Sequence, residues 1–278
     1  LSSSSAASDV YKRQPSTNVV AGKLESVGNP YASAIDFASV VTTSTGIDTK
    51  YYVWDPLIPG SNGYGAYQTI SSVNGYKPVP GGTANYNAAV SYSKIQSGQA
   101  FFVFSTSGGT VNFAENNKLT GSNMVFRNAG NAPASIRLSL YGSNGSLADG
   151  NLVVLNESFS NSIDASDAKK LENFGENIGI LKYGTLLAID ARKPVIDQDT
   201  VFYQTGNLRT QQYRIELIPE QLQDRVADAY WIDKFLGTRT QVNLNGPTNI
   251  TITVSNESGS KAADRFYLVF KPLQVLPV

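Results

Sequence analysis

Two segments of the chain alternate apolar and polar residues with a period of two. In ASIRLSLYG every second residue is apolar, namely Ile136, Leu138 and Leu140. QQYRIELIP repeats the pattern with Tyr213 and Ile215. This period is typical of a strand that buries one face and exposes the other. Such a face needs a second layer to cover it, so we predict an all-β chain. Other residues expected on apolar parities, and so in the same core, are Leu217, Ile252, Val254, Phe266 and Leu268.

Composition favours the same fold class. Charged residues make up only 16% of the chain, against about 25% in an average protein. Gly, Ser, Thr, Asn and Tyr are abundant, which suits strands and turns better than salt-bridged helices. About ten strands make a β-sandwich, jelly-roll-like in type. Further strands are expected at 124–127, 151–157, 185–191, 200–204, 229–235, 239–244, 249–255 and 265–271.

The length of 278 residues predicts two domains, at about 150 residues each. Residues 1–14 (LSSSSAASDVYKRQ) have no hydrophobic period and read as a disordered leader or as sequencing read-through. We expect a first β domain at 15–118 and a second β-sandwich domain at 119–278. The loop NNKLTGS at 116–122 has the composition of a boundary.

Short helical insertions and turns are expected inside these domains. Residues 31–41 have the length for one or two helical turns after Pro30, and 165–174 predicts a short helix with Ala168, Leu171 and Phe174 on one face. Gly108-Gly109 between two apolar runs predicts one hairpin, and Leu236-Gly237 predicts another. Residues 56–99, rich in Gly, Pro, Asn and Tyr, read mostly as loop.

The sequence contains no His and no Cys. Their absence excludes Ser-His-Asp and Cys-His nucleophilic sites, the usual zinc sites, haem ligation by these residues and disulfides. We predict no metal and no cofactor. Lys and Arg number 22, as do Asp and Glu, so no net field attracts nucleic acid. No apolar run approaches the roughly 18 residues of a membrane helix, so we predict no membrane insertion.

Carboxylates remain the one source of catalytic or metal-binding chemistry. Asp197, Asp199, Asp164 and Asp167 offer oxygen ligands, but they lack the spacing and Gly of a calcium loop and also suit turns and caps. A glycosidase needs an acid and a base at a fixed separation, which one sequence does not reveal. Candidates for such a pair are Asp36, Asp55, Glu115, Glu157, Glu172 and Glu176.

Aromatic residues concentrate in the Gly/Tyr-rich stretch of the first half. They form a candidate ligand-binding platform for a sugar ring, made by Trp54, Tyr52, Tyr64, Tyr67 and Tyr76, with Tyr51 beside them. Alternatively, Trp54 is core in a strand and the tyrosines pack the long loop down. Exposed coplanar rings would favour sugar binding, and buried rings would oppose it. Trp231 alternates with its neighbours in an expected hairpin, so we predict a packing role for it.

Several segments resemble a known group of proteins. They are, in order, SVGNPYASAIDF, YYVWDP, IQSGQAFFVFS, VNFAENNK, DAKKLENFGENIGIL, DTVFYQTGNL, YWIDKFLGTRTQVNL and GSKAADRFYLVF. Their order and spacing resemble the C-terminal β-rich region of adhesin-like secreted and cell-surface proteins of Bacteroidetes, exported by the type nine (Por) secretion system. The resemblance implies an extracellular or outer-surface location and a place within a larger chain. It also implies a C-terminal sorting tail. We expect QVLPV, at residues 274–278, to lie just before that tail.

The predicted function is therefore a non-catalytic extracellular structural and adhesive module of a larger secreted surface protein. One alternative is a carbohydrate-binding module that stacks a glycan on the aromatic residues of the first domain. Another is a carboxylate-dependent, glycan-active enzyme, which would require two carboxyl groups about 5–10 Å apart in one cleft. The expected partner is a glycan or another cell-surface ligand.

Overall fold

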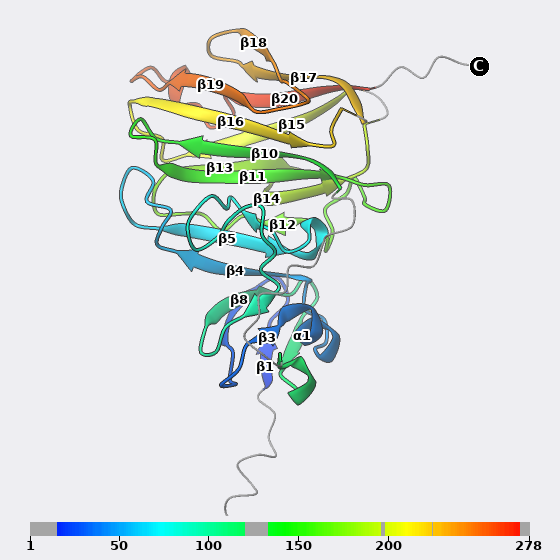
Figure 1. Cartoon of the computed structure of the whole chain (residues 1–278). Helices are drawn as coiled ribbons and strands as arrows, with labels where there is room; N and C mark the ends of the chain where they lie inside the picture. Colours follow the sequence, from blue (N-terminus) through cyan, green and yellow to red (C-terminus); the bar gives the residue numbers. More distant parts are fainter. Residues whose placement is uncertain (1–15, 120–132, 196–197, 224, 273–278) are drawn as a thin grey trace, which may run out of the picture. The chain divides into compact units, whose positions relative to one another are not determined.

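The computed structural model describes residues 16–119, 133–195, 198–223 and 225–272. These residues are almost entirely strands and connecting segments, which confirms the all-β prediction (Figure 1). The predicted leader at 1–14 and the predicted strand at 124–127 lie outside the described residues. No helix in the described part of the chain is long and apolar enough to cross a membrane.

The chain packs into two units. Of the described residues, 16–53 and 92–119 form unit 1, and 54–91 with 133–272 form unit 2. The chain crosses between the units at 53/54 and at 91/92, and a third time after residue 119, outside the described residues, so the boundary expected at 118/119 stays a prediction. Residues 54–91, expected in the first domain, belong to unit 2. Sequence-remote hydrogen bonds explain the difference, because Asn173 Oδ1 accepts from the Tyr67 N–H at 3.0 Å and Glu176 Oε2 from the Ser61 N–H at 3.1 Å.

Unit 1 is built from short antiparallel pairs around a small aromatic core. In the sheet, β8 pairs with β2 on one side and with β4 on the other, while β1 pairs with β9 and β3 with β7. The elements are β1 (Ser16–Val19), β2 (Leu24–Gly28), β3 (Ile35–Asp36), α1 (Phe37–Thr43), β4 (Lys50–Asp55), β7 (Lys94–Ile95), β8 (Ala100–Phe104), β9 (Gly109–Asn112) and a 3₁₀ turn, η3 (Glu115–Asn117).

Helix α1 confirms the expectation of helical turns near 31–41. It buries Phe37 and Val40 on one face. The Phe37 ring contacts the rings of Tyr51 (4.8 Å between centroids) and Phe101 (5.9 Å), which join the helix to the sheet. These fully buried rings form the centre of unit 1.

The hairpin predicted at Gly108-Gly109 is wrong. Strands β8 and β9 flank these glycines as expected, but β9 pairs with β1 and β8 with β2 and β4. The reason is a close approach of a different segment. A Cβ on Gly109 would lie 2.1 Å from the Thr45 carbonyl oxygen, and Thr45 forms a bridge with Thr110. The glycine therefore admits this neighbouring backbone instead of forming a two-strand turn.

Unit 2 contains one long curled sheet and a smaller pair. The strand order of the long sheet is β18-β17-β20-β15-β13-β14-β11-β10-β16-β19, with β12 beside β14. Its strands are β10 (Ala134–Tyr141), β11 (Leu147–Leu155), β12 (Ala168–Lys169), β13 (Asn177–Lys182), β14 (Thr185–Arg192), β15 (Asp199–Gly206), β16 (Gln212–Glu220), β17 (Val226–Asp233), β18 (Thr238–Gln241), β19 (Thr248–Thr253) and β20 (Phe266–Pro272). The remaining elements are β5 (Ala66–Ser71), β6 (Pro78–Val79) and the 3₁₀ turns η2 (Ser72–Asn74) and η4 (Gly259–Lys261).

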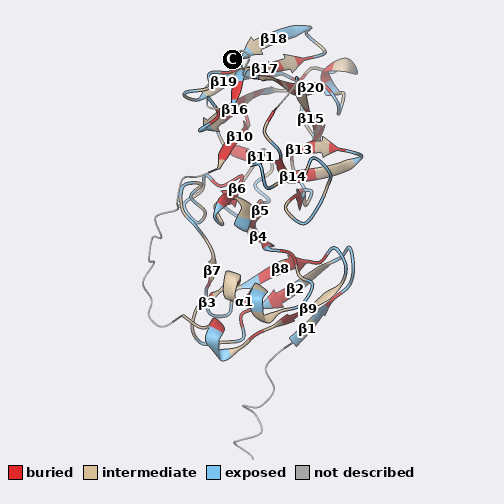
Figure 2. Cartoon of the chain, turned by 90° about the vertical axis from the view of Figure 1, so that its right-hand side faces the viewer, coloured by how far each residue is buried: buried red, intermediate tan, exposed pale blue. Residues whose placement is uncertain are grey.

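The long sheet folds over on itself as a sandwich. Figures 1 and 2 show β10, β11, β16 and β19 in one layer and β13, β14, β15, β17 and β20 in the other. The two layers meet where β11 pairs with β14 in parallel, the register running from Leu152 opposite Ile189. Every residue of β11 is buried, as expected for a parallel strand covered on both faces.

The predicted core is confirmed in unit 2. All ten residues that we placed on apolar parities are buried, with exposed fractions of 2% or less, and they form one cluster between the layers. Figure 2 shows the buried residues following the strands and the exposed residues gathering in the loops. The hairpin at Leu236-Gly237 is also confirmed, because β17 pairs with β18 across it and Gly237 takes φ 63°.

The helix predicted at 165–174 is wrong. The Asp164 N–H donates to Asp167 Oδ2, and the Ser166 N–H to Asp164 Oδ1, so the aspartates close a single turn. Ala168 then enters β12 opposite Ile189 and is fully buried. The spacing of apolar residues was helical, but these side-chain bonds to the backbone compete with a helix. Phe174, expected on the helix face, is 77% exposed.

Candidate functional site

The five predicted ligand-binding residues do not form one platform. Tyr52 lies in β4 and is fully buried, because the strand is covered on both sides. Tyr64 is 61% exposed, and Tyr76 is half-buried in a left-handed conformation with φ 60°. Trp54 and Tyr67 do meet, edge to face, with centroids 4.8 Å apart and an interplanar angle of 80°.

A third ring completes an aromatic cluster that the sequence did not predict. Phe174 lies 5.9 Å from Trp54, tilted by 65°, and most of its side chain is exposed. We call Trp54, Tyr67 and Phe174 the aromatic cluster. Trp54 also rests on the backbone of Gly65, where an added Cβ would come within 2.7 Å of the indole nitrogen. Within the cluster, Trp54 therefore packs against the Gly65 backbone, and Phe174 is open to solvent.

Hydrogen bonds hold the loop that presents Phe174. Asn177 Nδ2 donates to the carbonyl oxygens of Asn173 and Gly175, each at 2.9 Å, and its Oδ1 accepts from the Asn173 N–H at 2.7 Å. Asn207 Nδ2 adds a bond to the Gly175 carbonyl at 3.2 Å. Because the backbone on both sides of Phe174 is fixed, its exposure is built into the fold and binding requires little further ordering of the backbone.

A small polar pocket lies next to this loop. It encloses about 100 Å³. The lining residues, from the loop and from strands β13 to β15, are Glu172, Asn177, Leu186, Gln204, Thr205, Gly206 and Asn207. Amide, hydroxyl and carboxylate groups thus stand beside an exposed ring, a combination that provides both stacking and hydrogen bonding.

Glu176, a candidate acid or base, has a structural role. Its Oε2 accepts the Ser61 N–H at 3.1 Å, and its Oε1 accepts the Tyr213 hydroxyl at 3.2 Å. Burial by itself would raise the pKa of Glu176, but hydrogen bonds from Ser61 and Tyr213 outweigh it, and the pKa lies below its ordinary value of 4.5. The carboxylate therefore stays ionised and fastens the segment at Ser61 within unit 2.

Replacing Glu176 by Gln is expected to lower the free energy of unfolding at pH 7 by about 1–2 kcal/mol. A carboxylate whose pKa is depressed by folding contributes stability above its ordinary pKa and loses it as the pH falls through the depressed value. The difference between wild type and E176Q should therefore shrink from pH 7 to pH 3 in urea titrations. Glu157→Gln, at an exposed position, is the matched control and should change little. A difference that grew toward pH 3 would contradict this account.

Two more of the candidate carboxylates are engaged within the protein. Asp55 is fully buried and accepts from Gln68 Nε2, the Thr83 hydroxyl and the Leu57 N–H. Glu115 pairs with Lys118 at the surface. Among the described residues, no group of three or more Asp and Glu side chains is placed to hold a metal ion. Asp197 lies outside the described residues.

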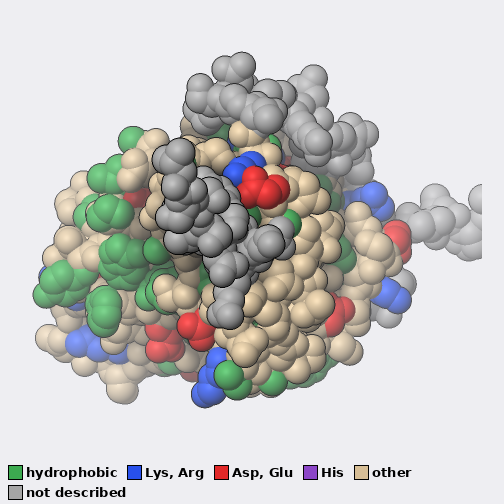
Figure 3. Space-filling view, turned by 90° about the horizontal axis from the view of Figure 1, so that it is seen from below, with side chains coloured by type: hydrophobic (Ala, Val, Ile, Leu, Met, Phe, Trp, Pro, Cys, Tyr) green, Lys and Arg blue, Asp and Glu red, His purple; other side chains and the backbone are tan. Residues whose placement is uncertain are grey.

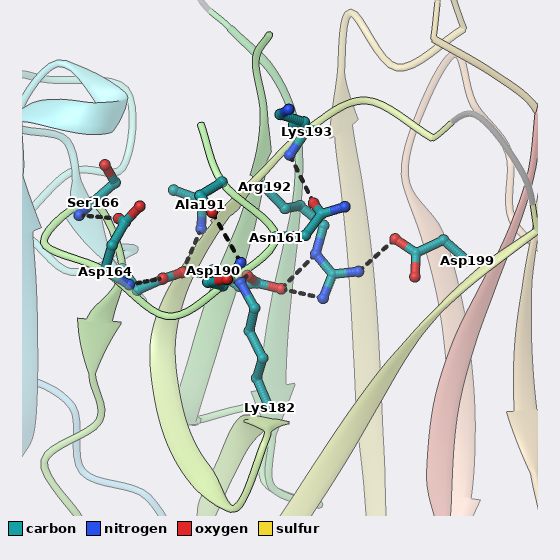
Figure 4. A network of polar contacts seen from close by, with 12 residues as sticks. Asn161, Asp164, Ser166, Lys182, Asp190, Ala191, Arg192, Lys193 and Asp199 are labelled. Carbon is teal, nitrogen blue, oxygen red and sulfur yellow. Dashed lines mark hydrogen bonds and ion pairs between the residues drawn. The ribbon is translucent and has the colours of Figure 1, made fainter. Parts of the chain in front are cut away.

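Five buried or half-buried charged side chains of unit 2 form a charge network, made by Asp167, Lys182, Asp190, Arg192 and Asp199. Figure 4 shows Lys182 and Arg192 converging on Asp190. Lys182 Nζ lies 2.8 Å from Asp190 Oδ1 and 3.6 Å from Asp167 Oδ1. Arg192 donates from Nε and Nη2 to Asp190 Oδ2, both at 2.7 Å, and from Nη1 to Asp199 at 2.6 Å.

The electrostatics of this network differ from one carboxyl to the next. Burial raises the pKa of Asp167 to about 6, although its oxygens accept the N–H groups of Ala191 (3.0 Å) and Asp164 (2.9 Å). Burial would lower the pKa of Arg192, but Asp190 and Asp199 raise it instead. Asp190 therefore lies between Lys182 and Arg192, and burial favours the neutral form of Asp167. The sequence named Asp164, Asp167 and Asp199 as oxygen ligands, and the structure pairs Asp167 and Asp199 with cations.

A comparison with family models places the chain. The family described as Domain of unknown function (DUF8693) matches residues 3–270. The chain belongs to this family. No curated protein and no solved structure matches it. The aromatic cluster and the charge network are the two candidate sites on this DUF8693 chain.

Sequence reasoning missed Phe174 and the charge network for different reasons. Phe174 sits in ENFGEN, where acidic and amide residues and a glycine flank a lone aromatic residue. That composition is a signal for an exposed ring, whereas the spacing from Ala168 and Leu171 predicts a helix face. The charge network joins residues of β13, β14 and β15 with the turn before β12, which only the strand pairing brings together.

Proposed function

We propose that the chain is a non-catalytic, extracellular adhesive and structural module of a larger exported surface protein, and that its ligand contact is the aromatic cluster. The exposure of Phe174 beside Trp54 and Tyr67 is the observation that carries this proposal. A large apolar ring held outward by hydrogen bonds on both sides costs solvation unless a partner covers it. The resemblance to adhesin-like surface proteins supports the same role.

The ligand class that suits this surface is a glycan. A sugar ring presents an apolar face for stacking and hydroxyl groups for hydrogen bonding. Phe174 and Trp54 offer the first contact, and the pocket at Glu172, Gln204 and Asn207 offers the second. Figure 3 shows Lys and Arg interspersed with Asp and Glu on the face it draws. That mixture, with 22 residues of each sign in the chain, suits an uncharged ligand better than a polyanion.

A carboxylate-dependent enzyme is the less supported alternative. The two carboxyls of the charge network that share Lys182 are both buried, with side-chain exposures of 1% for Asp167 and 0% for Asp190. The carboxylate oxygens of Asp55 and Glu176 accept hydrogen bonds from other groups within unit 2. A polysaccharide cannot reach such groups, whereas a stacking ligand reaches Phe174 directly.

Glycan binding by the aromatic cluster is tested with a glycan array followed by calorimetry on the best glycan. Phe174→Ala and Trp54→Ala are each expected to weaken binding at least about tenfold, or about 1.4 kcal/mol, because each removes a ring from the contact. Phe202→Ala is the matched control, since Phe202 is 52% exposed and contacts Tyr267 elsewhere in unit 2. It should bind like wild type.

Two outcomes would contradict this proposal. If Phe202→Ala weakens binding as much as Phe174→Ala, the contact is not at the aromatic cluster. If no glycan on the array binds, the ligand class is wrong. Turnover of any polysaccharide that disappears on replacing a single Asp or Glu would overturn the non-catalytic role as well.

A further inference from the structure

The charge network contains the parts for a covalent cross-link. We infer that Lys182 and Asp167 condense within the folded chain to form an amide between Lys182 Nζ and Asp167 Cγ, with Asp190 as the proton-transfer group. This inference concerns a modification site in unit 2 and does not depend on the ligand of the aromatic cluster.

Proximity is the first argument. Lys182 Nζ lies 3.6 Å from Asp167 Oδ1, an oxygen bonded to the carbon that the amine attacks. The two side chains are thus already in contact as an ion pair, so folding meets most of the entropic cost of bringing the amine and the carboxyl together. Lys182 is 6% exposed, and Asp167 accepts backbone N–H groups at both oxygens, so both groups are held in place.

The two carboxyls have distinct roles. Arg192 donates twice to Asp190 Oδ2, and Asp190 Oδ1 faces Lys182 at 2.8 Å as a proton acceptor. A carboxyl group bound to two cations in this way is a poor electrophile. Asp167 lies against Lys182 alone among the cations of the charge network, and burial favours its neutral form, which is the form an amine attacks. The Ala191 N–H at 3.0 Å from Oδ1 stabilises the negative charge that develops there.

The step balances without an oxidant or a reductant. Asp190 takes a proton from the Lys182 ammonium, and the free amine attacks Asp167 Cγ to give a tetrahedral intermediate. Asp190 then returns this proton to the departing oxygen of Asp167 and takes up the second proton that the nitrogen loses on becoming an amide, so Asp190 ends protonated. One C–N bond forms, one C–O bond breaks, and one water leaves. The low exposure of all three side chains keeps bulk water from reversing the step.

The cross-link would close the segment from Asp167 to Lys182 into a loop. That segment carries β12, the loop of Phe174 and β13. A covalent bond at its base restricts the unfolded chain, as other cross-links do. The result is a loop whose two ends stay joined when the surrounding sheet is strained, a property suited to a module under load.

Intact mass spectrometry of the purified, folded full chain tests the inference. The expected mass is lower than the sequence mass by one water, and fragmentation should join the peptide of Asp167 to that of Lys182. Lys182→Arg keeps the positive charge and should restore the full mass. Asp190→Asn keeps both reacting groups and should also abolish or slow the loss of water.

A matched control separates this site from other dehydration. Lys170 forms a comparable buried pair with Asp149, at 2.7 Å with exposures of 4% and 0%, but no second carboxylate among the described residues pairs with it. Lys170→Arg should therefore keep the mass deficit, whereas Lys182→Arg should lose it. The full sequence mass in wild type would overturn the inference, whether or not any variant folds. A deficit that persists in Lys182→Arg, or a link mapped to Asp190 or to Asp149-Gly150, would also overturn it.

Discussion

Replacing Arg265 by Ala is expected to lower the free energy of unfolding by about 3–5 kcal/mol, the usual cost of breaking a buried ion pair from one side. Arg265 is 1% exposed and bonds Asp233 through Nε at 2.9 Å and Nη2 at 2.6 Å. Its Nη1 donates to the carbonyls of Thr253 and Ser260, each at 3.0 Å. The Ala variant leaves the buried Asp233 carboxylate without its cation and two carbonyl oxygens without the Arg265 donor. Guanidinium denaturation, followed by Trp fluorescence, measures the loss.

The adjacent ion pair between Lys234 and Asp264 is the matched control. Its side chains are 43% and 72% exposed, and exposed pairs are worth about 0–1 kcal/mol. Lys234→Ala should therefore cost at most about 1 kcal/mol under the same conditions. If the two variants lose similar free energies, burial of the Arg265 pair does not have the importance assigned to it here.

Replacing Trp231 by Ala is expected to cost about 3–5 kcal/mol, the range for removing a large aromatic side chain from a core. Trp231 is 1% exposed and lies between two other rings, with centroids 5.2 Å from Phe266 and 5.3 Å from Tyr203. These three rings come from β15, β17 and β20 of one layer. Removing the Trp231 side chain leaves a cavity between the other two rings. Chemical denaturation with a circular-dichroism signal measures the effect.

The indole N–H of Trp231 has no hydrogen-bond partner in the described part of the chain. Packing should therefore account for almost the whole effect, and Trp231→Phe should keep more than half of the stability that Trp231→Ala loses. A Phe variant as unstable as the Ala variant would indicate a polar role for the indole nitrogen.

The phase of a strand, meaning which of its residues face the core, was predictable from the sequence because it depends on the polarity of individual residues. One side chain on each parity, such as Leu138 against Arg137, decides which face is buried, and no knowledge of the partner strand is needed. The same local rule predicted the hairpin at Gly237. It fails where a remote group competes. At 164–168 the aspartates bind the backbone, and Asp167 reaches Ala191, so a helical spacing became a turn and a strand.

The candidate site was predictable only in part for the same reason. Trp54 and Tyr67 stand in a stretch visibly rich in aromatic residues, but their third ring, Phe174, comes from a segment more than a hundred residues away. The assignment of 54–91 to unit 2 likewise depends on bonds to Asn173 and Glu176. Tyr52 looked like its neighbours in sequence, yet β4 buries it, because a strand covered on both faces has no exposed parity.

The folded-over sheet of unit 2 also sets how the chain reaches its native state. Strand β10 lies between β11 and β16, so Leu138 must find Leu217, and β11 must find β14 in parallel. Strand β20, last in the described sequence, lies between β15 and β17. Pairing such distant segments requires large loops to close, and the entropy of loop closure is lost before the stabilising contacts form. All-β domains of this kind therefore fold in milliseconds to seconds. Because β20 lies inside the sheet, between β15 and β17, the sheet order is complete only when this last described strand has paired.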